Sequence, residues 1–154
     1  MSALRLDDTD RALIGLLQRD GRLPYSRLAP AVGLSEAATR QRVQRLIDSG
    51  AIQVVAVADP LRLGPPARIV AMVGVRVQGE VRACAARLAE LPEAIWVVAT
   101  SGPYDVIAEM VCEDHEHLLR VLDERVRSLP GVQATESWLE LGVFKHSFAY
   151  GTGR

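Results

Sequence analysis

The chain has 154 residues, of which 49% are hydrophobic and 24% charged, proportions typical of a water-soluble globular protein. No stretch approaches the roughly 18 uninterrupted apolar residues that span a membrane, and the acidic N-terminus lacks the apolar core of a signal peptide. These features argue against a membrane or exported protein and predict a cytoplasmic one. The net charge of −1 argues against unspecific coating of nucleic acid.

The charge is unevenly distributed along the chain. Residues 1–62 carry nine arginines and seven acidic residues, whereas residues 63–154 carry nine basic and twelve acidic residues. The first part is therefore net positive and the second net negative. Within the first part, positive charge is concentrated at Arg40, Arg42 and Arg45.

A first helix is predicted over residues 6–18. Its apolar residues recur at helical spacing, at Leu13, Ile14, Leu16 and Leu17. Asp7 or Asp8 can cap its N-terminus, and Asp10 in the first turn favours the helix dipole. Gly21 is expected to end this helix.

Two further helices are predicted on either side of a tight turn. Ser26 is the expected N-cap of the second helix, which ends at Gly33, and Pro30 then falls at its fourth position, where a proline costs little. The third helix is expected to begin after Ser35 and to end at Gly50. Two helices joined by a glycine-containing turn are typical of a helix-turn-helix.

The outward face of the third helix carries residues suited to a DNA groove. Its members are Ser35, Ala37, Ala38, Arg40, Gln41, Gln44 and Arg45. Small side chains let the helix approach the groove floor, glutamine and arginine can bond base edges, and arginine can neutralise phosphates. An ordinary solvated helix face has a similar composition, so composition alone leaves both interpretations open.

A strand and a linker are predicted after the third helix. Residues 52–57 are rich in β-branched residues and are expected to form the strand of a wing. Prolines and Gly64 interrupt any regular element beyond it. The expected organisation is a winged helix-turn-helix domain at 1–52, a strand and linker at 53–66, and a second domain at 67–154.

The second domain shows a βαββαβ order of elements. Strands are predicted at 68–77, 95–99, 106–112 and 132–143, and helices at 81–91 and 115–129. Leu91-Pro92 and Leu129-Pro130 end the two helices in equivalent places. This order predicts a ferredoxin-like sandwich, so the chain as a whole is an α+β protein. One sheet face would stay uncovered and apolar, which favours a homodimer.

The whole pattern resembles the Lrp/AsnC, or feast/famine, family of regulators. The segments that carry the resemblance are Leu6-Asp7-Asp8-Thr9-Asp10, Asp20-Gly21-Arg22, Leu28-Ala29, Val32-Gly33-Leu34-Ser35, Arg42-Val43-Gln44-Arg45-Leu46, Gly50-Ala51-Ile52, Ser101-Gly102-Pro103-Tyr104-Asp105, and Pro130-Gly131-Val132 followed by Thr135. Each segment is weak by itself, but their order and spacing are specific to the family.

The resemblance implies a transcriptional regulator whose action on DNA is modulated by a small molecule, an amino acid in this family. It also implies a dimer that assembles into tetramers or octamers, with the effector bound between dimers. The effector site maps onto Gly102, Tyr104 and Asp105, with Thr135 and Ser137 of a neighbouring subunit as further candidates. Asp105 could instead be an ordinary turn residue that bonds backbone.

The family also has enzyme relatives, the sirohaem decarboxylases, so catalysis is the alternative function. Histidine would carry it, but His115 and His117 are two residues apart and would not share a helical face, and His146 stands alone. The sequence also contains no nucleophile motif, phosphate loop or cysteine cluster. We therefore expect no catalytic residue, no metal and no cofactor.

Overall fold

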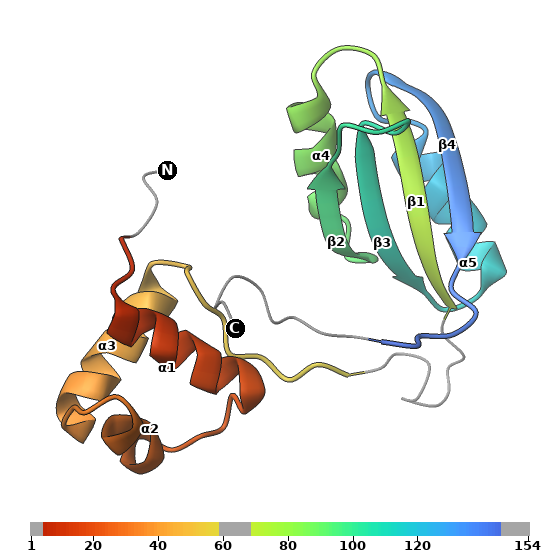
Figure 1. Cartoon of the computed structure of the whole chain (residues 1–154). Coiled ribbons are helices and arrows are strands. Elements are labelled where there is room, and N and C mark those ends of the chain that lie inside the picture. The colour runs from red at the N-terminus through yellow and green to blue at the C-terminus, as the bar shows by residue number, and fades with distance from the viewer. Residues whose placement is uncertain (1–4, 59–68, 146–154) are drawn as a thin grey trace. The chain divides into compact units, whose positions relative to one another are not determined.

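The computed structural model describes residues 5–58 and 69–145, which belong to two compact units (Figure 1). The first unit extends to Val57 and the second from Ala58 to Phe144, and Lys145 is again assigned to the first. The first unit is helical, and the second contains a four-stranded sheet.

The first unit contains α1 (Asp8–Arg19), α2 (Tyr25–Ala31) and α3 (Glu36–Asp48). Asp7 caps α1 by accepting a hydrogen bond from the backbone N–H of Asp10, whose side chain in turn accepts from the N–H of Asp7. The helices meet around Leu13, Leu28 and Val43, which are all buried. In α1, the helical spacing therefore predicts the burial of Leu13 and Ile14 correctly, whereas Leu16 and Leu17 are only half-buried.

The expected N-cap of α2 is wrong. The helix begins at Tyr25, because the carbonyl of Pro24 accepts hydrogen bonds from the N–H groups of Arg27 and Leu28. Ser26 consequently lies inside the first turn, and Pro30 lies two positions further into the helix than expected. Pro24 occupies the N-cap with an extended backbone, φ −69° and ψ 153°, and no side chain caps this helix.

The strand expected at 52–57, and with it the wing of the DNA-binding domain, is not formed among the described residues. Residues 52–58 have no regular secondary structure. Val54, Val55 and Val57 are 50%, 69% and 56% exposed. A β-branched run forms a strand only where another strand satisfies its backbone groups, and no described segment of the chain pairs with this one.

The second unit confirms the ferredoxin-like order. It contains β1 (Ile69–Val77), α4 (Val81–Ala89), β2 (Ala94–Ala99), β3 (Val106–Cys112), α5 (His115–Arg120) and β4 (Val132–Leu139). The strands are arranged β2-β3-β1-β4, and every neighbouring pair is antiparallel. Both helices lie on one face of the sheet, and no described helix covers the other (Figure 1). We call this other face the open sheet face.

Strand register decides which side chains reach the core between sheet and helices. Val73 of β1 and Ala108 of β3 are directly opposite each other, and both are fully buried on the helix side. Their neighbours Met72 and Glu109 are also opposite each other and therefore lie on the open sheet face. The alternation assigns every β1 and β3 residue to one of the two faces.

The second helix and last strand of this unit are shorter than expected. After α5, the chain continues as a π-helical turn, η2 (Val121–Val126), which the N–H of Arg127 closes by bonding the carbonyl of Leu122. β4 ends at Leu139, which is opposite Ala71 of β1, rather than at residue 143, although the N–H of Glu140 still bonds the carbonyl of Val70. The spacing of apolar residues in the sequence predicts neither the π-helical turn nor the end of β4 at Leu139.

Candidate nucleic-acid interface and ligand site

The face of α3 proposed to contact DNA is exposed because the opposite face forms the core. Thr39, Val43 and Leu46 are buried, and Ser35 caps the helix by accepting a hydrogen bond from the N–H of Ala38 at 3.2 Å. Ala38 is half-buried, and the remaining predicted residues are exposed: Ser35, Ala37, Arg40, Gln41, Gln44 and Arg45. The structure thus brings this predicted set together on one surface.

Two arginines of α3 are held by carboxylates at the start of α1. Nη1 of Arg42 lies 2.7 Å from Oδ2 of Asp7 and 2.9 Å from Oδ1 of Asp10. Nη2 of Arg45 lies 2.5 Å from the other oxygen of Asp10. Asp10 is only 1% exposed, so both of its oxygens are used within the protein. Arg45, although predicted as a DNA contact, therefore also joins α3 to α1.

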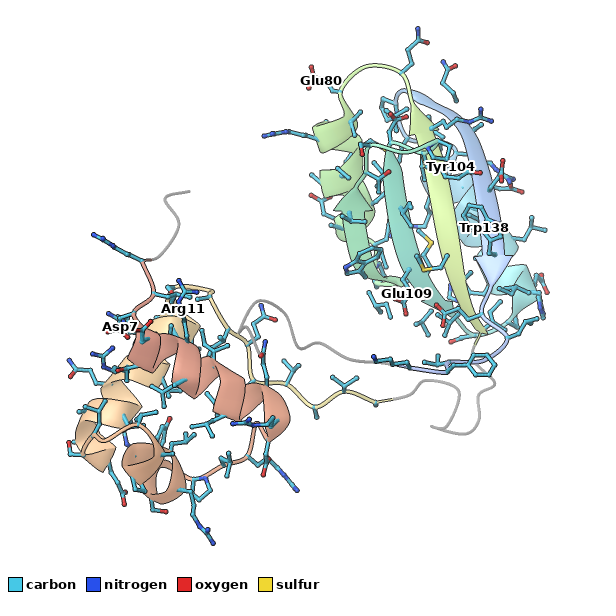
Figure 2. All side chains as sticks on the ribbon, viewed as in Figure 1. Asp7, Arg11, Glu80, Tyr104, Glu109 and Trp138 are labelled. Atoms are coloured by element: carbon cyan, nitrogen blue, oxygen red, sulfur yellow. The ribbon has the colours of Figure 1, made fainter. Side chains whose placement is uncertain are left out.

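The pKa of Asp7 is lowered by the same arrangement. The largest cause is the hydrogen bond that its carboxylate accepts from the N–H of Asp10, followed by the hydrogen bond from Arg42. Both bonds favour the charged carboxylate. Figure 2 shows Asp7 at the beginning of α1.

The third arginine, Arg40, has an aromatic partner. Its guanidinium carbon lies 4.5 Å from the centre of the Tyr25 ring, within the range of a cation–π contact. The sequence did not indicate this contact, since nothing in a linear pattern relates a residue of α2 to a residue of α3. Gln44, further along α3, donates a hydrogen bond to Asp48 at 2.7 Å.

The predicted effector residues lie in or near the turn between β2 and β3. Gly102 is exposed, whereas Tyr104 and Asp105 are half-buried. Oδ2 of Asp105 accepts a hydrogen bond from the N–H of Val77 at 2.8 Å, and its own N–H donates to the carbonyl of Val75 at 3.0 Å. Asp105 therefore fastens the turn to the end of β1.

Tyr104 lies on the open sheet face. A methyl group added at Gly74 would lie 2.7 Å from the Tyr104 ring, so the ring rests directly on the glycine backbone. The ring meets Trp138 of β4 edge-to-face at 5.3 Å between centroids, and Figure 2 shows the two side chains close together over the part of the sheet that β1 and β4 form. The pKa of Tyr104 is raised, first by the hydrogen bond that its hydroxyl donates to Glu136 and then by burial.

Thr135 and Ser137 lie on the opposite side of the sheet from Tyr104. They are directly across from Val75 and Val73, which point toward the helices. Oγ1 of Thr135 accepts a hydrogen bond from Nε of Arg127 at 2.9 Å. A single chain therefore does not bring Tyr104 and these two residues into one pocket.

Of the two histidines at the start of α5, His117 has partners within the second unit. Nε2 of His117 lies 3.4 Å from Glu93, and its Nδ1 accepts a hydrogen bond from the N–H of Glu113 at 3.3 Å. His115 is exposed, and His146 lies outside the described residues. Within 5–58 and 69–145, no group of three or more potential ligands could hold a metal ion.

Comparison with known families identifies both units. Residues 6–47 match the model for the AsnC-type helix-turn-helix domain, and residues 70–150 match that for the Lrp/AsnC ligand binding domain. The chain belongs to the Lrp/AsnC family. It is a transcriptional regulator with a helix-turn-helix DNA-binding domain and a ligand-binding domain. None of the described helices is both long and apolar enough to cross a membrane.

Relatives of this Lrp/AsnC chain align over almost its full length. The HTH-type transcriptional regulator FL11 of Pyrococcus furiosus is 34% identical over 144 residues, which cover 92% of this chain and 93% of FL11. Leucine response regulatory protein LrpA of Mycobacterium tuberculosis has a similar structure, with a TM-score of 0.82, 28% identity, and coverage of 94% and 99%. Transcriptional regulator NMB0573 of Neisseria meningitidis, solved as an L-Met complex, also has a similar structure, with a TM-score of 0.73 and 28% identity. The alignment covers 93% of this chain and 94% of NMB0573.

Proposed function

We propose that this Lrp/AsnC regulator binds specific double-stranded DNA through the exposed face of α3, and that an amino acid modulates its DNA binding or its assembly. The observation that carries the first part is the sidedness of α3. Thr39, Val43 and Leu46 are buried, while six of the seven proposed contact residues are exposed. A helix with one side fixed in a core can present the other to a major groove.

The chemistry of that face suits base recognition. Ala37 and Ala38 occupy the first turn, where short side chains let the helix backbone approach the bases. Gln41 and Gln44 can form paired hydrogen bonds with adenine, and Arg40 with guanine or a phosphate. Arg45 is 48% exposed despite its bond to Asp10, so its remaining N–H groups can reach a phosphate.

An amino acid fits the predicted ligand residues. Its ammonium group needs an acceptor such as the Asp105 carboxylate, and its carboxylate needs N–H donors such as those of a turn containing Gly102. Tyr104, and Thr135 and Ser137 from a neighbouring subunit, complete the proposed site. The L-Met bound to the Neisseria regulator supports this class of effector.

A homodimer is proposed because the open sheet face exposes large apolar side chains. Trp96 and Trp138 are 49% and 45% exposed there. A second copy that covers this face would remove these side chains from water. Further assembly into tetramers or octamers would bring Thr135 and Ser137 of one subunit toward the turn of another, and the assembly is proposed to act in the cytoplasm.

The DNA-binding part is tested by selecting duplexes from a random pool with the purified full-length protein. Enrichment of one sequence, with affinity that falls as salt rises, is the expected result. Equal affinity for all duplexes of the pool would contradict specific recognition.

The effector part is tested by measuring the melting temperature with each of the twenty amino acids. A ligand at 100 times its Kd should stabilise the protein by ~2.7 kcal/mol. The amino acid that raises the melting temperature should also change the affinity for the selected duplex. No response to any amino acid would contradict the proposed effector class.

A further inference from the structure

The three arginines of α3 have different kinds of partner. Arg42 and Arg45 bond Asp7 and Asp10, so two positive and two negative charges are joined within the first unit. Arg40 forms no ion pair and donates no hydrogen bond among the residues that the structure describes. Its contact there is with the ring of Tyr25, 4.5 Å from the guanidinium carbon.

Tyr25 is a rigid platform for this contact. It is the first residue of α2, directly after Pro24, and its ring is half-buried. One side of Tyr25 packs against the small core formed by Leu13, Leu28 and Val43. The ring is therefore positioned by the fold, and Arg40 is positioned by the ring.

A guanidinium held over an aromatic ring keeps most of its hydrogen-bonding capacity, because the ring attracts its charge without offering the oxygen acceptors of a carboxylate. An aromatic ring attracts the flat face of the group, while the five N–H donors lie in its plane and point away from its centre. The same donors would be occupied if a carboxylate held the arginine, as it does Arg42. The contact with Tyr25 also limits the side-chain freedom of Arg40 before DNA arrives, which lowers the entropy lost on binding.

We propose that Tyr25 is a positioning residue for DNA recognition, which holds Arg40 so that its donors meet an acceptor of the DNA. Arg42 braces α3 against α1, and Arg45 does so with one of its nitrogen atoms, so that its other donors can still reach a phosphate. The proposal rests on the DNA-binding function proposed above and adds the division of labour among the arginines. The acceptors that suit these donors are O6 and N7 of guanine or the oxygens of a phosphate.

The test measures Kd of full-length variants for the duplex selected by the wild type and for a scrambled duplex of equal length. Tyr25→Leu should weaken binding to the selected duplex by about 3- to 30-fold, since it removes the aromatic face. Tyr25→Phe keeps that face and should stay within about 2-fold of the wild type. Arg19→Ala, at the C-terminal end of α1, removes one positive charge elsewhere in the first unit and is the control for the Arg40→Ala variant used below.

The decisive comparison repeats Tyr25→Leu in a protein that already carries Arg40→Ala. If the ring acts through Arg40, the second substitution should add less than about 2-fold. An equal loss in both backgrounds would show that Tyr25 only supports the fold, and would overturn the proposal. If Tyr25→Leu does not fold, Tyr25→Met replaces it in both backgrounds, because methionine fills a partly buried position without an aromatic ring. An equal loss of affinity in both backgrounds would again overturn the proposal.

Two further measurements, salt dependence and base preference, distinguish a phosphate acceptor from a guanine acceptor. The Arg40→Ala variant and the wild type together also distinguish failure of this inference from failure of the proposed function. A phosphate contact predicts that Arg40→Ala reduces the slope of log K against log salt by about one, whereas a guanine contact predicts lost preference at one base pair with the slope unchanged. Arg40→Ala without effect on a wild type that binds its selected duplex would overturn this inference alone. A wild type that selects no sequence would instead contradict the proposed function.

Discussion

Oδ2 of Asp10 in α1 lies 2.5 Å from Nη2 of Arg45 in α3, and Asp10 is almost completely buried. The same carboxylate accepts a hydrogen bond from Arg42, which Asp7 also holds. The helix expected to enter the DNA groove is thus tied to the first helix by charged groups in addition to the apolar core. A buried carboxylate with two arginine partners is stable only while both remain in place.

Replacing Asp10 should therefore destabilise the first unit. We expect Asp10→Ala to cost about 2–4 kcal/mol, because it removes the partner of Arg45 and half of the pairing of Arg42. Asp8→Ala removes an exposed carboxylate from the same helical turn and controls for the effect of charge on the helix dipole. Hydrogen exchange of the α1 and α3 amides in the full-length protein measures the difference. Equal protection in both variants would contradict a structural role for the buried carboxylate.

A substitution at Thr39 is expected to stabilise the protein. Thr39 is completely buried, and its hydroxyl oxygen has no hydrogen-bond partner among the described residues. Thr39→Val keeps the shape of the side chain and removes the unsatisfied hydroxyl, so the free energy of unfolding should rise by about 1 kcal/mol. Thr39→Ser keeps the hydroxyl and loses a methyl group, and should lower it by a similar amount. A melting temperature that falls with valine would contradict this assignment.

The pairing of Tyr104 with Glu136 should be visible in the titration of tyrosine. The neutral phenol is favoured by its hydrogen bond to Glu136, which raises the pKa of Tyr104 above its ordinary value. Because the folded pKa is raised, the stabilisation is present below the pKa of the unfolded chain and is lost as pH rises through the folded pKa. Glu136→Gln should therefore lower the pKa of Tyr104 toward about 10.

Ultraviolet absorbance of tyrosinate measures this change, and Tyr104→Phe identifies which step of the titration belongs to Tyr104. An unchanged titration curve in Glu136→Gln would mean that the two side chains do not interact in solution.

Local signals in the sequence were sufficient for most of the fold. The cap at Ser35, the turn at Gly33, where φ is +68°, and the proline-terminated helices set the order of elements correctly. The sequence was insufficient where a partner decides the outcome. Val54 and Val55 have the composition of a strand, but a strand also needs a neighbour that composition does not reveal.

The same reasoning applies to the candidate sites. The exposed face of α3 follows from helical spacing, which is a local property. The bond between Asp10 and Arg45 joins residues 35 positions apart and could not be read from spacing. Tyr104 and Asp105 are adjacent in the sequence, yet the ring of Tyr104 rests on Gly74 at the open sheet face, whereas Asp105 bonds the backbone of Val77. The sequence motif groups these two residues because adjacency in a sequence does not show in which direction each side chain points.

Asp105 offers the sharpest distinction between a ligand contact and a structural turn. Its carboxylate accepts the N–H of Val77, and Asp105→Asn keeps an oxygen that can accept the same bond. The variant should fold with a melting temperature close to that of the wild type. If the carboxylate also binds the ammonium group of the effector, losing its charge should weaken effector binding by about 1.5–3 kcal/mol, or roughly 10- to 150-fold in Kd.

Asp105→Ala completes the comparison, because it removes the acceptor as well as the charge. The N–H of Val77 would lose its partner, so the free energy of unfolding should fall by about 1–3 kcal/mol. Calorimetric titration with the amino acid found by the melting screen, carried out on the wild type and both variants, separates the two roles. Weak effector binding by Asp105→Asn with unchanged stability assigns the charge to the ligand. Equal affinity in wild type and Asp105→Asn, with stability lost only in Asp105→Ala, would make Asp105 a structural residue and place the ammonium-binding group elsewhere.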